Sequence, residues 1–152
     1  MTLQEDVERL RSIPLFAKID PSKLKLLAFA AERVTYEPGE VLFRQGDIGD
    51  AAYIIVDGSA AVEVPSPSGP LTVARLGRND FVGEIAILCD VPRTATVRAA
   101  ERLTTLKISK DLFFRMVCQF PQISVEVMRE LARRLERTTH QLQEAMDRSG
   151  SA

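Results

Sequence analysis

Turn-forming residues divide the middle of the chain, from about Val34 to Ile108, into short β-rich segments. These signals stand at Pro38-Gly39, Gly46 to Gly49, Asp57-Gly58, Pro65 to Pro70 and Gly77 to Asp80. Short strands separated by a turn about every ten residues are typical of antiparallel sandwiches and barrels. The sequence therefore predicts a mainly β fold with flanking α-helices, built on an antiparallel jelly-roll barrel over residues 34–108.

Two segments inside this region carry more specific predictions. The dipeptide Asp57-Gly58 favours a tight turn, so we expect a hairpin that joins Tyr53–Val56 to Ala60–Val64. The run from Phe81 to Cys89 is apolar without strict alternation, which predicts one or two helical turns set within the barrel.

Helices are expected before and after the barrel in the sequence. In residues 1–33, Leu3, Val7 and Leu10 recur at helical spacing, and Asp20-Pro21 combines an N-cap with proline at the first helical position. Two short helices are therefore predicted before the first strand.

Two more helices are expected in residues 109–148. Ser109 can cap the first, and Pro121 separates it from a longer helix that runs from about Gln122 to Asp147. Arg148 to Ala152 is predicted to be a frayed tail.

The long helix carries two rows of side chains. Its apolar row has spacings of three and four and consists of Met128, Leu131, Leu135, Thr138, Leu142 and Ala145. This row is interpreted either as a face that packs over the domain core or as a coiled-coil seam, and the polar Thr138 weakens the second interpretation. The other row is predicted to be a solvated face and consists of Arg129, Arg133 and Arg137.

The composition is that of one globular domain covering residues 1–152. The formal charge of −1 gives no basic excess for a polyanion, and 45% hydrophobic residues exclude a disordered chain. Cys89 and Cys118 have no metal-type spacing and are predicted to be buried free thiols. No run approaches the ~18 apolar residues of a membrane span, and Met1 to Asp6 does not resemble a secretory signal, so a cytoplasmic location is expected.

One acidic and one basic side chain flank the short helix predicted inside the barrel. Glu84, as an ionised carboxylate, only accepts hydrogen bonds and suits a sugar hydroxyl, whereas Arg93 offers a planar fork that matches two phosphate oxygens. Gly83 has no Cβ, so the backbone amides of Glu84, Ile85 and Ala86 can approach a ligand closely. These residues predict a site for a cyclic sugar phosphate.

The same residues resemble a known family. Gly83-Glu84-Ile85-Ala86 and Pro92 to Val97 are similar to the two halves of the phosphate-binding cassette of cyclic nucleotide-binding domains. These domains regulate cyclic-nucleotide-dependent kinases, gated channels and catabolite-activator-type transcription factors. Three further segments fall where that family would place them: Ile13-Pro14-Leu15-Phe16, Pro38 to Leu42 and Gln45-Gly46-Asp47.

The resemblance implies a sensor of cAMP or cGMP with no catalytic activity and no cofactor besides that ligand. It implies that the amides of Thr94 and Ala95, with the Thr94 hydroxyl, help to hold phosphate or base. Thr94 leaves the choice between cAMP and cGMP open. The C-terminal helices are expected to cover the base. Partners besides the nucleotide are an effector domain or protein, or a second copy bound through the last helix; no direct nucleic-acid contact and no membrane segment are expected.

Other interpretations compete with this one. Glu84 alone can be a solvated acid at a helix N-terminus, and Arg93 alone can be a surface residue paired with any acid, including Asp90. A metal-dependent jelly-roll enzyme needs several histidines, and this chain has only His140. A DNA-binding regulator needs a helix-turn-helix after the long helix, so that role requires the chain to be a fragment. A fragment of a channel, transporter, kinase or cyclase, or a scaffold without ligand, also remains.

Overall fold

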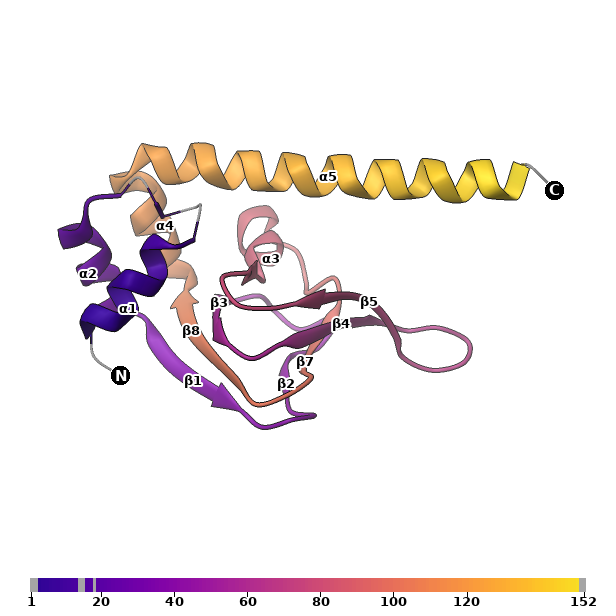
Figure 1. Ribbon diagram of the computed structural model, residues 1–152, viewed down its shortest axis with the longest axis horizontal. Helices are drawn as coiled ribbons and strands as arrows, with labels where there is room; N and C mark the ends of the chain where they lie inside the picture. The colour runs from indigo at the N-terminus through magenta and orange to yellow at the C-terminus, as the bar shows by residue number, and fades with distance from the viewer. Residues whose placement is uncertain (1–2, 14–15, 18, 151–152) are drawn as a thin grey trace.

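Two antiparallel sheets of four strands each face one another; most of the helices gather at one end, and the last helix runs along the length of the molecule (Figure 1). The computed structural model describes residues 3–13, 16–17 and 19–150. The first sheet has the order β1 (Glu32–Tyr36), β8 (Leu103–Ser109), β3 (Ala51–Asp57) and β6 (Phe81–Val82). The second has the order β2 (Val41–Phe43), β7 (Thr96–Ala99), β4 (Ala60–Val64) and β5 (Leu71–Leu76). The predicted jelly-roll class is confirmed.

Strand β3 is buried on both faces, which explains its nearly continuous apolar sequence. On one face Ile54 and Val56 join the core formed with the helices, and on the other Ile55 packs with Val97 and Leu103 between the two sheets. The first sheet is therefore the middle layer of the molecule.

The hairpin predicted at Asp57-Gly58 is wrong. The strands before and after it, β3 and β4, belong to different sheets, because both edges of β3 are occupied by β8 and β6. The turn is a corner between the sheets. Gly58 has a φ of +90°, and a Cβ there would collide with the carbonyl oxygen of Arg102.

The helix-capping predictions are confirmed. The Asp20 carboxylate accepts from the Ser22 amide at 3.1 Å and begins α2 (Pro21–Ala30), which follows α1 (Leu3–Arg11). The Ser109 hydroxyl accepts from the Leu112 amide at 3.2 Å and begins α4 (Lys110–Gln119). Pro14 and Leu15, in one of the segments that resembles the family, lie outside the described residues.

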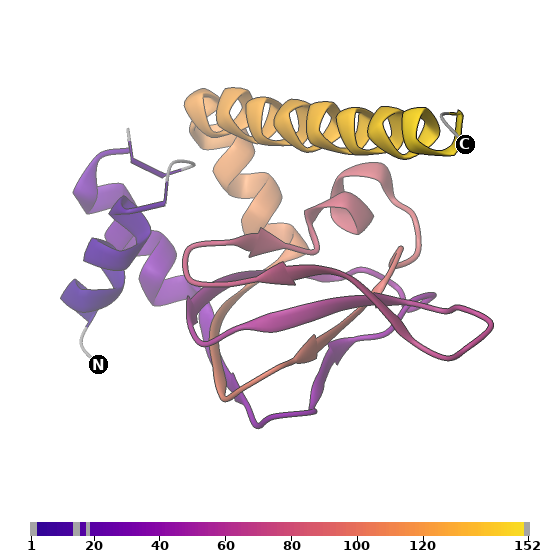
Figure 2. The same cartoon turned by 45° about the vertical axis from the view of Figure 1, so that its right-hand side comes forward.

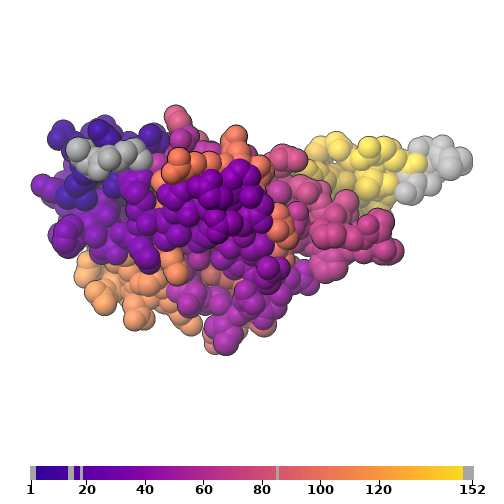
Figure 3. All heavy atoms as spheres, turned by 90° about the horizontal axis from the view of Figure 1, so that it is seen from below, coloured from indigo at the N-terminus to yellow at the C-terminus, as the bar shows by residue number. Residues whose placement is uncertain are grey.

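The last helix, α5 (Pro121–Gly150), is longer than predicted and includes most of the expected tail. Residues 151–152 lie outside the described part of the chain. Ile123 and Val127 anchor α5 in the core, whereas every residue from Leu135 to Arg148 is exposed. In two views α5 passes over the short helix α3 (Glu84–Cys89) (Figures 1 and 2), and its C-terminal part extends beyond the main body (Figure 3).

The prediction of two buried free thiols has a mixed outcome. Cys89 and Cys118 are free, but both are exposed rather than buried, since Cys89 ends α3 and Cys118 lies on the outer side of α4.

Within the described residues, no helix combines the length and apolar character needed to cross a bilayer.

Candidate functional site

A cavity of about 600 Å³ lies between the sandwich and α5. Strands β4 and β5, the start of α3, the segment after Arg93 and the inner face of α5 all contribute to its wall. Six of the seven predicted site residues line it: Gly83, Glu84, Ala86, Arg93, Thr94 and Ala95. The seventh, Ile85, lies in the first turn of α3. The structure thus brings the two motif halves to one cavity.

Arg93 is buried, with 3% of its surface exposed, and is held by backbone carbonyls. Its Nη1 donates to the oxygen of Gly83 at 2.8 Å, and its Nη2 donates to the oxygen of Ala51 at 2.5 Å. Nε is buried and has no hydrogen-bond partner within the described part of the chain. Burial lowers the pKa of Arg93, and nearby Tyr53 and Asp50 oppose that shift. A guanidinium fixed in this way keeps donors for an anion.

The backbone of Arg93 is fixed by the loop that follows β2. The Arg93 amide donates to the carbonyl of Asp47 at 2.8 Å, and the Gly46 amide donates to the carbonyl of Arg93 at 2.9 Å. The Asp47 carboxylate in turn accepts from the Arg44 amide at 3.0 Å. The motif Gln45-Gly46-Asp47 therefore positions the arginine rather than contacting the cavity itself.

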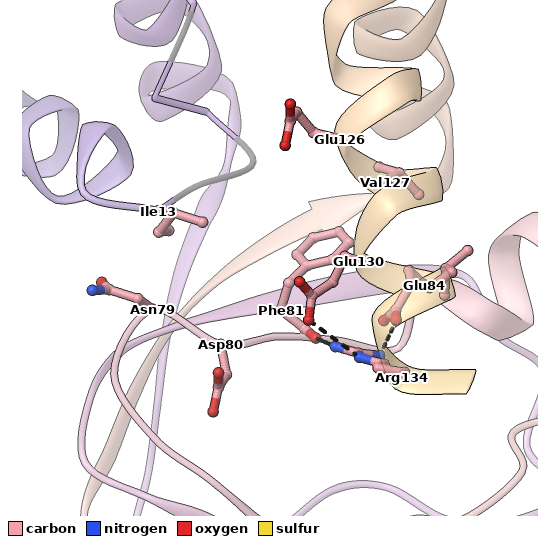
Figure 4. Close-up of a pocket in the computed structure, with 10 residues that line it drawn as sticks. Ile13, Asn79, Asp80, Phe81, Glu84, Glu126, Val127, Glu130 and Arg134 are labelled. Atoms are coloured by element: carbon pink, nitrogen blue, oxygen red, sulfur yellow. Dashed lines mark hydrogen bonds and ion pairs between the residues drawn. The ribbon is translucent and has the colours of Figure 1, made fainter. Parts of the chain in front are cut away.

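Glu84 opens α3 and is 2% exposed, so it is not the solvated acid of the alternative interpretation. One of its oxygens accepts from Arg134 of α5, which also donates to the carbonyl of Phe81 at 2.7 Å (Figure 4). The other oxygen, Oε2, is buried without a hydrogen-bond partner among the described residues. Burial raises the pKa of Glu84, and Arg134 opposes the shift.

The Glu84–Arg134 ion pair also borders a second hollow. This smaller space, of about 190 Å³, lies beneath the N-terminal half of α5 (Figure 4). Both residues line both spaces, so the pair separates the main cavity from the region where α5 is anchored.

Gly83 permits the close packing of these groups. Its φ is +93°, and a Cβ built there would lie 2.7 Å from Nη1 of Arg93 and 3.2 Å from the oxygen of Ala51. Any larger residue would both strain the backbone and displace the guanidinium.

The residues after Arg93 have simpler surroundings. Thr94 is exposed and Ala95 is half-buried, and both line the cavity just before β7. The hydroxyl with a structural role is that of Thr96, which accepts from the Gln45 amide at 3.0 Å. Asp90, the alternative partner for Arg93, instead lies 3.6 Å from Lys110.

Helix α5 divides the predicted apolar row between two faces. Leu131 packs against the core and Thr138 lines the cavity, whereas Met128, Leu135 and Leu142 are 61%, 69% and 61% exposed. Each interpretation of the row therefore fits some of its members.

The three arginines predicted to form a solvated row are all exposed, but Arg137 also lines the cavity, so the prediction holds in full only for the other two. Arg129 and Arg133 are exposed and pair along the helix, with Glu126 at 2.9 Å and Glu130 at 3.4 Å respectively.

Arg134 is a site residue that the sequence patterns did not single out. It lies between Leu131 and Thr138 at spacings of three and four, so it belongs to the face that covers the cavity. The signal that could have identified Arg134 is its position as a basic residue on a helix face whose other members point inward.

Taken together, the residues of the cavity offer a fixed guanidinium that suits a phosphate and a carboxylate oxygen that suits a hydroxyl. The described residues contain no group of three or more His, Cys, Asp or Glu placed to bind a metal.

Comparison with known proteins adds to this geometry. The family described as "Cyclic nucleotide-binding domain" matches residues 33–119. A cAMP-dependent protein kinase regulatory subunit of Blastocladiella emersonii is 38% identical over 109 residues, which cover 71% of this chain and 27% of that protein. A CRP-like cAMP-activated global transcriptional regulator of Mycobacterium tuberculosis is 30% identical over 131 residues, covering 84% and 58%.

The fold is shared as well. The structure of the Thermus thermophilus catabolite activator protein superimposes with a TM-score of 0.78 and 27% identity, over 86% of this chain and 62% of that one. The chain thus spans about a quarter to just over half of the length of the curated relatives named above.

Proposed function

The chain belongs to the cyclic nucleotide-binding domain family, and from that premise we propose that it is a regulatory domain whose cavity takes a 3′,5′-cyclic nucleotide. One observation carries the proposal: Arg93 and Glu84 are buried in the same cavity, and each keeps a polar atom without a partner in the described residues. Buried polar groups are costly unless they are hydrogen-bonded, so both favour a ligand with a phosphate and a hydroxyl.

The roles of the two residues follow from their chemistry. The Arg93 guanidinium binds the phosphate oxygens, together with amides of the first turn of α3. Glu84 accepts a hydrogen bond from the ribose 2′-hydroxyl through Oε2, since its other oxygen is already bonded to Arg134. The binding proposal contains no catalytic step.

Helix α5 is proposed to be the moving element. Arg134 bonds the same carboxylate that the ribose uses, so ligand binding changes the energy of the contact that holds α5 over the cavity. From Leu135 to Arg148 the helix buries no residue, and elements with little buried surface open at low free-energy cost. A ligand shifts the position of α5 only if it binds one arrangement more tightly than the other.

The choice of base is proposed from the relatives. Those compared above include proteins named for cAMP, which supports cAMP as the ligand. Thr94 at the cavity edge is compatible with either base, so cGMP is the necessary comparison. The exposed apolar side chains of α5, Met128, Leu135 and Leu142, are proposed as the surface that a second copy of the chain contacts, because they recur at coiled-coil spacing.

Calorimetric titration with cAMP, cGMP and 2′-deoxy-cAMP tests the binding proposal. Arg93→Ala should weaken cAMP binding by about 2–5 kcal/mol, as truncation of one partner of a buried charge pair does. Glu84→Ala should abolish the preference for cAMP over its 2′-deoxy analogue. Arg102→Ala is the matched control, because Arg102 is 74% exposed and lies outside the cavity. If the wild-type chain binds neither cyclic nucleotide at millimolar concentration, the proposal is wrong.

A further inference from the structure

The guanidinium of Arg93 lies over the ring of Phe43, with Cζ of Arg93 4.0 Å from the ring centroid. The carbonyls of Gly83 and Ala51 accept hydrogen bonds from the two terminal nitrogens of the guanidinium, and the Phe43 ring lies next to its central carbon. Arginine has one of the largest side-chain entropies, so confinement from two directions removes freedom that binding would otherwise remove.

Phe43 is itself held in place by its neighbours in the sandwich. Its ring lies 5.9 Å from that of Tyr53, with an interplanar angle of 31°, and Tyr53 belongs to the doubly buried strand β3. The pairing of β2 with β7 shifts register between Val41 and Phe43, and Phe43 packs against the core between the two sheets. Contacts with Tyr53 and with the core between the sheets therefore fix the position of the Phe43 ring.

The same short segment holds the arginine in two ways. Phe43 contacts its side chain, and Gly46 and Asp47 bond its backbone. We propose that Phe43 is a positioning residue of the binding site: it holds the Arg93 guanidinium in the geometry that receives the phosphate. This inference rests on the proposed function. Phe43 lies outside both cassette halves, Gly83 to Ala86 and Pro92 to Val97, to which the family resemblance assigns the ligand contacts.

A purely structural role would give Phe43 a different behaviour. A core phenylalanine that fills space would affect the free energy of unfolding and would leave the conformation of Arg93 unchanged. Phe113 is the matched control, because it is fully buried, stacks on Phe81 and lies outside the cavity.

Two measurements distinguish these roles, on wild type, Phe43→Leu, Phe43→Tyr and Phe113→Leu. The first is the ¹H–¹⁵N signal of Arg93 Nε without added nucleotide, assigned by its loss in Arg93→Lys. Because the guanidinium lies over a ring, this signal should show a ring-current shift in wild type, Phe43→Tyr and Phe113→Leu, and it should lose the shift in Phe43→Leu. The second is the affinity for cAMP. Phe43→Leu should weaken it by about fivefold to thirtyfold, Phe43→Tyr should restore it, and Phe113→Leu should alter only the melting temperature.

The outcomes separate this inference from the proposed function. Absence of binding by the wild-type chain contradicts the proposed function, whatever the arginine signal shows. Binding by the wild type with equal affinity in Phe43→Leu, or a wild-type signal without a ring-current shift, overturns the role of Phe43. A Phe43→Tyr variant as weak as Phe43→Leu does so as well, because the ring would then not be the cause.

Discussion

Substitution of Gly83 by alanine should damage both the fold and the site. A residue other than glycine at a φ of +93° costs about 1–2 kcal/mol through backbone strain. The added Cβ would lie 2.7 Å from Nη1 of Arg93, so the guanidinium must leave the Gly83 carbonyl. Loss of a hydrogen bond to a charged group adds about 1.5–3 kcal/mol. The expected total loss of unfolding free energy is about 2.5–5 kcal/mol.

The control for this substitution is Gly39→Ala. Gly39 has a φ of +88°, but no atom lies within 4 Å of the position that a Cβ would take, so this change carries only the backbone strain. Urea unfolding followed by circular dichroism should show a loss of about 1–2 kcal/mol for Gly39→Ala. Calorimetry should show weaker cAMP binding for Gly83→Ala only. If the two variants lose equal stability and bind cAMP alike, the contact between Gly83 and Arg93 has no energetic importance.

Three further predictions concern Glu84 and α5. Because burial raises the folded-state pKa of Glu84, the folded state holds this proton more tightly than the unfolded state. The unfolding free energy should therefore fall as pH rises from about 4.5 through the raised pKa, and urea titrations should show that Glu84→Gln removes this part of the slope. Leu135→Glu should convert a wild-type dimer to a monomer in sedimentation equilibrium without loss of stability; a monomeric wild type contradicts the proposed seam. Amide exchange along residues 127–142 should slow on addition of cAMP more than exchange in the β-strands, and equal slowing argues against a moving α5.

Local signals in the sequence were reliable because the contacts behind them are local. Asp20 and Ser109 bond amides two and three residues away, and Pro121 begins α5 where a proline is tolerated. The arrangement of Glu84 and Arg93 around one cavity was also predictable, since only a short helix and turn separate them. Their motif spacing almost fixes where the side chains can lie.

Non-local contacts escaped prediction for an equally physical reason. The Asp57-Gly58 turn has hairpin chemistry, yet the strand after it joins the other sheet, because β8 and β6 already pair with β3. That choice depends on segments that lie tens of residues further along the chain. The Glu84–Arg134 contact likewise spans 50 positions, and no local pattern specifies it.

The two buried charges are held by separate partners rather than by each other. Arg93 is fixed by backbone carbonyls and by Phe43, all within the sandwich, so its geometry does not depend on where α5 lies. Glu84 is bonded by Arg134, so its environment changes whenever α5 moves. A ligand group that contacts Arg93 therefore meets donors already in position and gains affinity without moving the helix. A group that contacts Glu84 alters the contact that holds α5 in place. In the proposed sensor, phosphate recognition would thus supply most of the affinity, and recognition of the ribose hydroxyl would supply the coupling to the helix.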